Sequence, residues 1–364
     1  MEPPEGTPAL LMDLDMVAAA HRAMVAALPG VGLHYAMKCN PFRPVLTLLN
    51  SLGCRFEVAS TTELAELLAI GVDAGEVLFS NPVKPVSHIE RAYRAGVRTF
   101  SFDSAEELAK LAGAAPASAV VVRLAAHGID SDVPSEGKFG VDAGTAATLL
   151  AAASDLGLRP YGVAFHVGSQ MMWPQAWRAP LHAVGEIMGK LAADNIHLDL
   201  VNVGGGFPVR YSVVPPPLSE YGRVIAAGLA DLPYPVRAVA EPGRALVAEA
   251  GTLVSTVIGT ATRFGKRWIH LDVGAFNGLM ESLETGNQLR FPVADSVAAP
   301  VRELCNLTGP TCDSQDTIVF DVELSAGLAA GDLVYIGCAG AYTTVYASNF
   351  NGFEPPSIRC VSSC

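Results

Sequence analysis

Eight strand-like runs alternate with helical patterns over the first two thirds of the chain, and this rhythm limits the possible folds more than any other feature. The runs cover residues 33–37, 55–58, 77–79, 98–101, 119–124, 161–165, 198–202 and 237–240. Apolar residues at helical spacing lie between most of them, as over 61–69, 86–95, 104–112 and 143–156. Strands that alternate with helices form a parallel sheet, and eight such units over roughly 210 residues match a (β/α)₈ barrel.

Two of the expected helices also carry start motifs. Ser60 is followed by Glu63 and Ser104 by Glu107, the spacing of a capping box at a helix N-terminus. A doubly wound open sheet is the rival arrangement, but the first strand is not followed by its G-x-G-x-x-G turn. The sequence therefore predicts a closed barrel formed by residues 28–246.

The rhythm changes after about residue 246. Short strand-like runs at 253–258, 268–271, 317–320 and 333–336 are separated by Gly, Pro and Asp turns, without a long helical pattern between them. We expect residues 247–364 to form an all-β domain, sandwich-like or barrel-like. Residues 1–27 are assigned to the same domain, because a strand-like run at 10–12 precedes the barrel.

Composition and charge exclude several classes of function. The chain of 364 residues has 24 Lys and Arg against 36 Asp and Glu, a net charge of −12, which argues against a nucleic-acid partner and an anionic membrane surface. No segment approaches the ~20 apolar residues of a membrane span, and the first residues lack the features of a signal peptide. The seven cysteines have neither paired nor zinc-like spacing, which favours reduced thiols in a cytoplasmic protein without a metal site.

A single lysine stands at the end of the first barrel strand. Apolar residues lead up to Lys38, and Pro41 disfavours helix at Asn40, so the lysine is expected at or just past the strand end. There we expect it to be half-buried, which lowers the pKa of an amine and favours a Schiff base with an aldehyde. The alternative is a structural lysine whose stem covers apolar surface while its ammonium group stays in water.

Other polar groups follow further barrel strands, at the end where barrels bind ligands. They are Glu57, Ser60 and Thr61 after the second strand, His166 to Ser169 after the sixth, Gly204 to Gly206 after the seventh, and Glu241 to Arg244 after the eighth. Glycine N–H groups can approach an anion closely and an arginine adds charged hydrogen bonds, so the last two turns suit a phosphate. A flexible turn is the structural alternative.

Pyridoxal phosphate would use all of these groups. Its aldehyde needs an amine, for which Lys38 is the candidate, and its phosphate needs the glycine turn. Its ring nitrogen needs an acidic partner, a role for which Glu241 is suited. His166 is a candidate to stack on the ring, and the hydroxyl of Tyr342 is a candidate to reach the phosphate or the ring.

A second candidate group lies in the β domain, in the turn of residues 309–316. Cys312 stands beside carboxylates in a Gly-Pro turn, where a thiol is exposed enough to react. Cys312 is a candidate proton donor to a carbanion, and Asp313 is a candidate to bind an ammonium group. The alternative is a polar loop with a small buried thiol.

The sequence resembles the pyridoxal-phosphate-dependent ornithine, lysine, arginine and diaminopimelate decarboxylases. The resemblance is carried, in the family's order, by residues 35–40, 56–60, 166–169, 204–208, 241–244, 309–316 and 340–343. The ending, with residues 348–353, is most similar to ornithine decarboxylases. The resemblance implies a barrel like that of alanine racemase, a β-sandwich-like domain, and a homodimer in which residues 312 and 313 reach into the neighbouring subunit's barrel.

The resemblance also implies roles for individual residues. Lys38 binds the cofactor aldehyde, His166 stacks on the ring, Glu241 pairs with the ring nitrogen, Cys312 donates the proton and Asp313 binds the distal amine of the substrate. Lys138 and Asp316 match an ion pair between subunits. The implied cofactor-binding set is Lys38, Glu57, Arg123, His166, Ser169, Gly204, Gly205, Gly206, Glu241, Gly243, Arg244 and Tyr342.

The expected reaction is decarboxylation of ornithine or lysine to the diamine and CO₂. Three features concern the substrate: Glu57 stands where ornithine decarboxylases usually have Asp, the chain is short around residues 128–136 and 285–300, and residues 274–284 resemble bacterial enzymes. That last segment leaves open whether Glu281 or Glu284 is the second carboxylate for the distal amine. Alternatives are arginine, a carboxyspermidine or a carrier-tethered amino acid as substrate, a racemase, a phosphate-binding isomerase, and a non-catalytic paralogue.

Overall fold

The computed structural model describes residues 6–126, 137–297 and 299–361, so the short stretch expected at 128–136 lies outside the described residues. The chain forms two compact units. The barrel unit comprises residues 21–208 and 216–243, and the sheet unit comprises residues 1–20, 209–215 and 244–364. The sequence-based division into domains at residues 28 and 246 lies near these boundaries, but it leaves residues 209–215 with the barrel.

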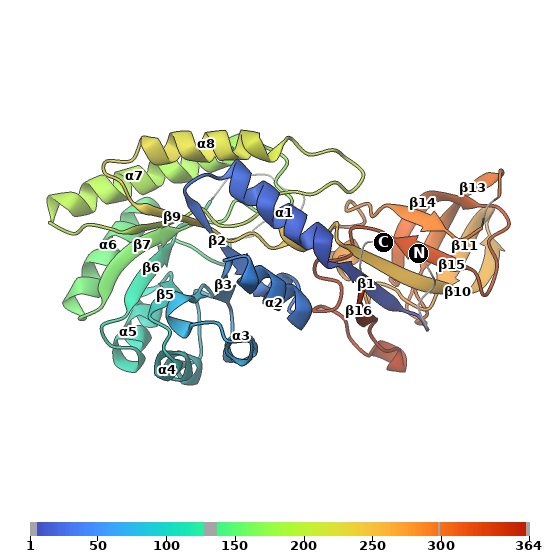
Figure 1. Ribbon diagram of the computed structural model, residues 1–364, viewed down its shortest axis with the longest axis horizontal. Helices are drawn as coiled ribbons and strands as arrows, with labels where there is room; N and C mark the ends of the chain where they lie inside the picture. The colour runs from blue at the N-terminus through green and yellow to red at the C-terminus, as the bar shows by residue number, and fades with distance from the viewer. Residues whose placement is uncertain (1–5, 127–136, 298, 362–364) are drawn as a thin grey trace. The chain divides into compact units, whose positions relative to one another are not determined.

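The barrel unit contains a closed barrel of eight parallel strands in sequence order, as the sequence predicts (Figure 1). The barrel closes where Val31 of the first strand pairs with Ala238 of the last. The strands are β2 (Val31–Ala36), β3 (Arg55–Val58), β4 (Leu78–Phe79), β5 (Thr99–Phe102), β6 (Ala119–Arg123), β7 (Arg159–Ala164), β8 (Leu200–Asn202) and β9 (Arg237–Ala240).

Helices cover the outside of the barrel (Figure 1). They are α2 (Arg43–Ser51), α3 (Thr61–Ala69), α4 (Val86–Ala95), α5 (Ala105–Ala114), α6 (Ala143–Asp155), α7 (Arg178–Ala193) and α8 (Leu218–Ala230), with 3₁₀ turns η1 (Met37–Cys39), η2 (Ala74–Glu76) and η3 (Pro174–Trp177), while α1 (Leu14–Ala27) is divided between the two units. Both predicted caps are confirmed: Ser60 Oγ accepts a hydrogen bond from Glu63 N at 3.2 Å, and Ser104 Oγ accepts one from Glu107 N at 3.1 Å. Across the described residues, no helix is long and apolar enough to cross a bilayer.

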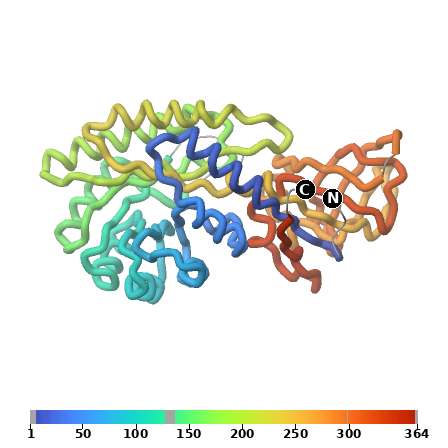
Figure 2. The backbone as a smooth tube through the Cα atoms, in the orientation of Figure 1, coloured from blue at the N-terminus to red at the C-terminus, as the bar shows by residue number. Residues whose placement is uncertain are grey.

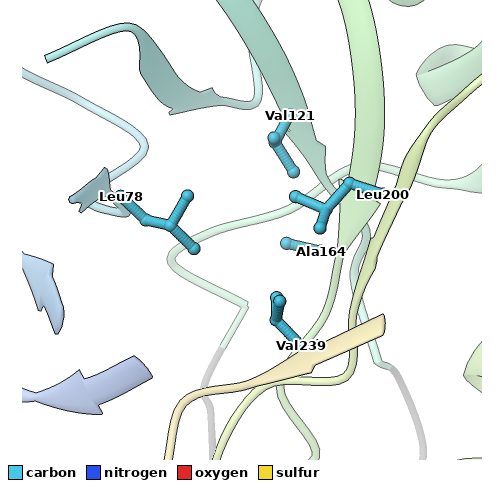
Figure 3. Close-up of a cluster of buried hydrophobic side chains, with 5 residues drawn as sticks. All are labelled: Leu78, Val121, Ala164, Leu200 and Val239. Atoms are coloured by element: carbon cyan, nitrogen blue, oxygen red, sulfur yellow. The ribbon is translucent and has the colours of Figure 1, made fainter. Parts of the chain in front are cut away.

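The barrel interior is filled by apolar side chains. Figure 3 shows five of them pointing toward one another from five different strands: Leu78, Val121, Ala164, Leu200 and Val239. Each is at most 8% exposed. Side chains packed in this way fill the barrel interior, so ligands are expected to bind at the loops that follow the strand ends.

The sheet unit is built on an eight-stranded mixed sheet, in agreement with the predicted second domain of β-strands. Its strands are β1 (Ala9–Asp13), β10 (Gly251–Arg263), β11 (Lys266–Leu271), β12 (Val293–Asp295), β13 (Arg302–Thr308), β14 (Thr317–Ser325), β15 (Leu333–Ile336) and β16 (Ser357–Val361). The single-turn helices α9 (Arg244–Val247) and α10 (Glu281–Glu284) and the 3₁₀ turn η4 (Phe350–Gly352) interrupt it. Sequence reasoning missed β12, β13 and β16; β13 begins with three exposed residues, two of them charged, which breaks the apolar alternation.

The first strand belongs to this sheet, as predicted. β1 pairs antiparallel with β10, with Leu10 opposite Leu253, and parallel with β16, with Ala9 opposite Ser357. Figure 2 shows the blue start of the chain beside its dark-red end. β1 is thus paired on both sides, and four of its five residues are buried, so this strand contributes directly to the core of the sheet unit.

Candidate active site

Lys38 lies just past the C-terminal end of β2, where the sequence placed it. The hydroxyl of Tyr35 donates to the carbonyl of Asn40 at 2.9 Å, and Phe42 N donates to Asn40 Oδ1 at 3.0 Å, which fixes the turn after the strand. The Lys38 side chain is 53% exposed, in agreement with the half-buried position expected from the sequence. The 3₁₀ turn η1 buries residues 37 and 39 and leaves the lysine between them accessible.

Glu57 is the nearest acidic partner of Lys38. It lies on the neighbouring strand β3, and its Oε1 is 3.7 Å from Lys38 Nζ. Burial raises the pKa of Glu57 to about 8; the Lys38 ammonium opposes this rise, and the carboxylate of Glu241 adds to it. A carboxyl group that titrates near neutral pH beside an amine can take up and return a proton.

His166 follows β7 and carries a neutral imidazole. Gly168 N donates to its Nδ1 at 2.9 Å, so Nδ1 is the acceptor and the ring proton is on Nε2. Burial lowers the pKa of His166 well below its ordinary value, and the positive charges of Arg123 and Lys38 lower it further. Burial lowers the pKa of Arg123, at the end of β6, and the nearby carboxylates of Glu241 and Glu57 partly oppose that change.

The turn after β8 has no room for side chains. Gly204 and Gly206 have φ of +71° and +98°, which other residues rarely adopt. A Cβ on Gly205 would lie 2.4 Å from the carbonyl oxygen of Glu241 and 3.7 Å from His166 Nε2. Gly243 is equally confined, because its Cβ would lie 2.9 Å from Cys39 Cβ. The glycines therefore bring bare backbone close to His166 and Glu241.

Glu241 is held by two side chains that sequence reasoning missed. Its Oε1 accepts hydrogen bonds from Ser80 Oγ and, at 2.8 Å, from Asn202 Nδ2. Ser80 follows β4 and Asn202 ends β8, so both stand at the strand ends where barrels bind ligands. That position was the signal that could have identified them. Ser169 lies in the loop after β7, partly buried.

Arg244 organises a second cluster, within the sheet unit. Its side chain is 3% exposed, and its guanidinium donates through Nη1 to Tyr211 Oη at 2.5 Å and to Glu281 Oε2 at 3.0 Å, with Nη2 bound to Glu281 Oε1. The ring of Tyr342 lies 5.1 Å from its Cζ. Arg244 and Tyr342 are thus neighbours, and Tyr211 is a contact that no sequence motif marks.

The two carboxylates proposed for a distal amine differ in their surroundings. The Glu281 side chain is 6% exposed and bound by Arg244. Glu284 is exposed. Partial burial of its carboxyl group and the negative charge of Glu281 raise the pKa of Glu284, and the positive charge of Arg244 opposes this rise. Glu284 is therefore the one of the two whose side chain is accessible.

Cys312 and Asp313 are exposed in the turn after β13. Cys312 Sγ lies 3.4 Å from Asn351 Oδ1, which also accepts the backbone N–H of Cys312 at 3.3 Å. Asp313 Oδ1 accepts the N–H of Gln315 at 2.9 Å. A thiol and a carboxylate are therefore presented side by side on an ordered turn.

Asp316 stabilises that turn from inside. It has no exposed surface, and its carboxylate accepts hydrogen bonds from Thr311 N at 3.1 Å, Thr311 Oγ1 at 2.7 Å and Ala275 N at 2.7 Å. The ion pair expected between Lys138 and Asp316 of different subunits stays a prediction.

The residues at the C-terminal end of the barrel fit pyridoxal phosphate. They provide an accessible amine, a neutral imidazole, a held carboxylate, and a glycine turn that a single Cβ would obstruct. Residues 14–248 match the family model described as "Pyridoxal-dependent decarboxylase, pyridoxal binding domain". The chain belongs to the pyridoxal-phosphate-dependent decarboxylases, which confirms the family, fold and cofactor expected from sequence.

Three individual decarboxylases of this family resemble the chain along most of their length. The chain is 35% identical over 357 residues to a lysine/ornithine decarboxylase of Selenomonas ruminantium, covering 95% of this chain and 88% of the relative. Its fold matches the lysine/ornithine decarboxylase of Vibrio vulnificus solved with cadaverine, with a TM-score of 0.90, 32% identity and coverage of 98% and 95%. It also matches the arginine decarboxylase of Paramecium bursaria Chlorella virus, with a TM-score of 0.92, 26% identity and coverage of 98% and 97%.

Proposed function

We propose that this protein decarboxylates L-ornithine or L-lysine, releasing CO₂ and putrescine or cadaverine. The observation that carries the proposal is the accessible Lys38 amine, 3.7 Å from a buried Glu57, at the end of the barrel. Relatives of similar length are named lysine/ornithine decarboxylases. The arginine decarboxylase of similar fold makes arginine the second candidate substrate.

Pyridoxal phosphate supplies an aldehyde that joins the substrate amine and a ring that accepts the electrons left when CO₂ departs. In our proposal Lys38 holds that aldehyde before and after turnover, and Glu57 exchanges protons with the lysine amine. His166 presents a neutral ring face to the cofactor. Glu241 would keep the ring nitrogen protonated, with its carboxylate held in place by Ser80 and Asn202.

Within the barrel unit, the phosphate is assigned to the glycine turn of residues 204–206, Ser169 and Gly243; a phosphate role for Arg244 and Tyr342 stays a prediction from the family resemblance. Glu281 and Tyr211 hold the guanidinium of Arg244, so its orientation is fixed without a bound anion. Arg123 lies close enough to Glu57 and Glu241 to balance their charge at the cofactor.

For the substrate, we propose that Cys312 protonates the carbanion at Cα and that Asp313 binds the distal ammonium group. Because Glu281 is occupied by Arg244, Glu284 is the better candidate for the second carboxylate. Both Cys312 and Asp313 are exposed on their own chain, which suits residues that complete the site of a neighbouring copy. The proposal therefore includes a homodimer.

The test of the reaction is spectroscopic and chemical. Purified protein is titrated with pyridoxal phosphate and then given L-ornithine, L-lysine or L-arginine while CO₂ is collected. The proposal requires an absorbance band of the bound cofactor that Lys38→Ala loses, and CO₂ from ornithine or lysine. If the cofactor binds but CO₂ comes from arginine alone, arginine replaces ornithine and lysine as the substrate. If none of the three amino acids yields CO₂, the proposed decarboxylation is refuted.

The homodimer has its own test. Diamine is the product to measure, because Lys38→Ala and Cys312→Ala should each prevent its formation if the two residues belong to different halves of a shared site. Mixing the two variants restores activity to about a quarter of wild type, because random exchange makes half of the dimers mixed and each of these has one intact site. No restoration on mixing would mean that each chain completes its own site.

A cytoplasmic location is also part of the proposal. The six cysteines that the structure describes are free thiols, as expected in a reducing compartment. Location of the tagged protein by fractionation of its native cells would test this directly.

A further inference from the structure

Asn202 touches two different parts of the barrel end. Its Nδ2 donates to Glu241 Oε1 at 2.8 Å, and its Oδ1 accepts the N–H of Gly204 at 2.9 Å. Only 1% of the residue is exposed. A buried amide with both of its ends bonded is fixed in position, since breaking either contact leaves a polar group without water.

The orientation of this amide follows from its partners. A carboxylate oxygen accepts only, so the group facing Glu241 is the donor Nδ2. A backbone N–H donates only, so the group facing Gly204 is the acceptor Oδ1. A flipped amide would face both neighbours with the wrong polarity, so the two contacts together fix one orientation of the amide.

A backbone hydrogen bond joins the same two segments, the turn after β8 and the residue after β9. Glu241 N donates to the carbonyl oxygen of Gly204 at 2.8 Å. The turn after β8 and the residue after β9 are therefore joined once through the backbone and once through Asn202. The backbone bond sets how far apart the two segments lie, and the side chain sets where the Glu241 carboxylate points.

Ser80 acts on only one side of this arrangement. Its hydroxyl donates to the same Oε1 of Glu241, and Ser80 comes from the loop after β4. Both side-chain donors thus bond one oxygen of Glu241, which directs the other oxygen away from them. Ser80 and Asn202 differ in a useful way, because only Asn202 also holds the glycine turn.

We propose that Asn202 is a positioning residue that couples the two polar anchors of the cofactor, the carboxylate at its ring nitrogen and the glycine turn at its phosphate. This inference rests on the proposed function, which assigns those two anchors. Ser80 is the second positioning residue, for the ring end alone. The coupling means that a cofactor seated at one end finds the other anchor already in place.

The test compares three variants with the wild-type holoenzyme, using two resonances of bound pyridoxal phosphate. The nitrogen resonance of a labelled ring reports the Glu241 end, and the phosphorus resonance reports the glycine turn. Ser80→Ala should shift the nitrogen resonance and leave the phosphorus resonance in place. Asn202→Ala should shift both and weaken cofactor affinity about tenfold, as expected for loss of a hydrogen bond to a charged group.

Asn202→Asp separates the two contacts of one side chain. Aspartate keeps an oxygen for the N–H of Gly204 but loses the donor to Glu241 and adds a negative charge beside it. We expect it to shift the nitrogen resonance while sparing the phosphorus resonance. Because it preserves side-chain size, this variant keeps the test valid if Asn202→Ala fails to fold.

Ser118→Ala is the matched control. In the part of the chain that the structure describes, Ser118 Oγ is buried and has no hydrogen-bond partner, and it precedes β6 at the opposite end of the strands. It should leave both resonances and the affinity unchanged. The coupling is refuted if Asn202→Ala shifts only one resonance, or neither; a wild-type protein that binds no pyridoxal phosphate would instead refute the proposed function and this inference with it.

Discussion

Replacing Glu281 with glutamine tests how strongly the sheet unit depends on one buried charge pair. The side chains of Arg244 and Glu281 are 3% and 6% exposed, and two hydrogen bonds join them. Glutamine keeps the shape and one acceptor oxygen but removes the negative charge. Arg244 then stays buried without a carboxylate beside it, with the glutamine amide oxygen and Tyr211 Oη as the neutral acceptors of this cluster.

The magnitude follows from that geometry. Removing one partner of a buried ion pair typically costs about 3–5 kcal/mol, since the other charge is left uncompensated. The retained acceptor places Glu281→Gln near the lower end, about 3 kcal/mol or roughly a hundredfold in the unfolding equilibrium. The double variant Arg244→Met with Glu281→Leu should recover most of this loss, because it leaves no unpaired charge.

Amide hydrogen exchange in peptides from β10 and β13 is the suitable assay, because it reports the sheet unit separately from the barrel. The measurement uses protein without pyridoxal phosphate, so that ligand binding does not add to stability. We expect exchange of the most protected amides to speed up about a hundredfold in Glu281→Gln.

Glu303→Gln is the matched control within the same unit. Glu303 pairs with Arg267, but its side chain is 42% exposed, so the loss should stay within about 1 kcal/mol. The reasoning is refuted if Glu281→Gln speeds exchange no more than Glu303→Gln does, or if the double variant is as unstable as the single one.

Three further changes test other parts of the molecule. Because the pKa of Glu57 rises from 4.5 to about 8 on folding, the folded state holds this proton more tightly, and the free energy of unfolding falls as pH rises between these values. Urea titrations at several pH values should show a smaller fall in Glu57→Gln than in the wild type. An equal fall in both proteins would contradict the raised pKa. Glu107→Ala leaves the buried Lys84 ammonium unpaired and should cost about 3–5 kcal/mol in a urea titration, whereas a loss below that of a surface pair would refute the pairing. Cys312→Ala should lower the amount of diamine formed per CO₂, unlike the control Cys360→Ala on an exposed thiol, and an unchanged ratio would exclude Cys312 as proton donor.

The sequence predicted those features that depend on near neighbours in the chain. Alternating patterns located all eight barrel strands, and Ser60 and Ser104 marked two helix starts because a cap involves residues three apart. Lys38 was placed correctly at a strand end by Pro41. Its half-buried side chain was also expected, although a pattern of apolar residues does not reveal the 3₁₀ turn that follows the strand.

Contacts between distant residues were beyond such reasoning. Ser80 and Asn202 bond Glu241 although they lie 161 and 39 positions away in the sequence, and no motif predicts these contacts. Tyr211 likewise reaches Arg244 from a short segment that the sequence assigned to the barrel. The family resemblance gave Asp316 only a role between subunits, and its hydrogen bonds to Thr311 and Ala275 within the chain were not predicted.

The place of β1 in its sheet has a consequence for how the protein is made. β1 leaves the ribosome early, yet its two neighbours, β10 and β16, follow only after the entire barrel has been synthesised. The nascent chain therefore carries an apolar segment, Ala9 to Met12, with unpaired edges on both sides while the barrel folds behind it. Because β10 is synthesised before β16, its arrival during translation is what first covers one of these edges.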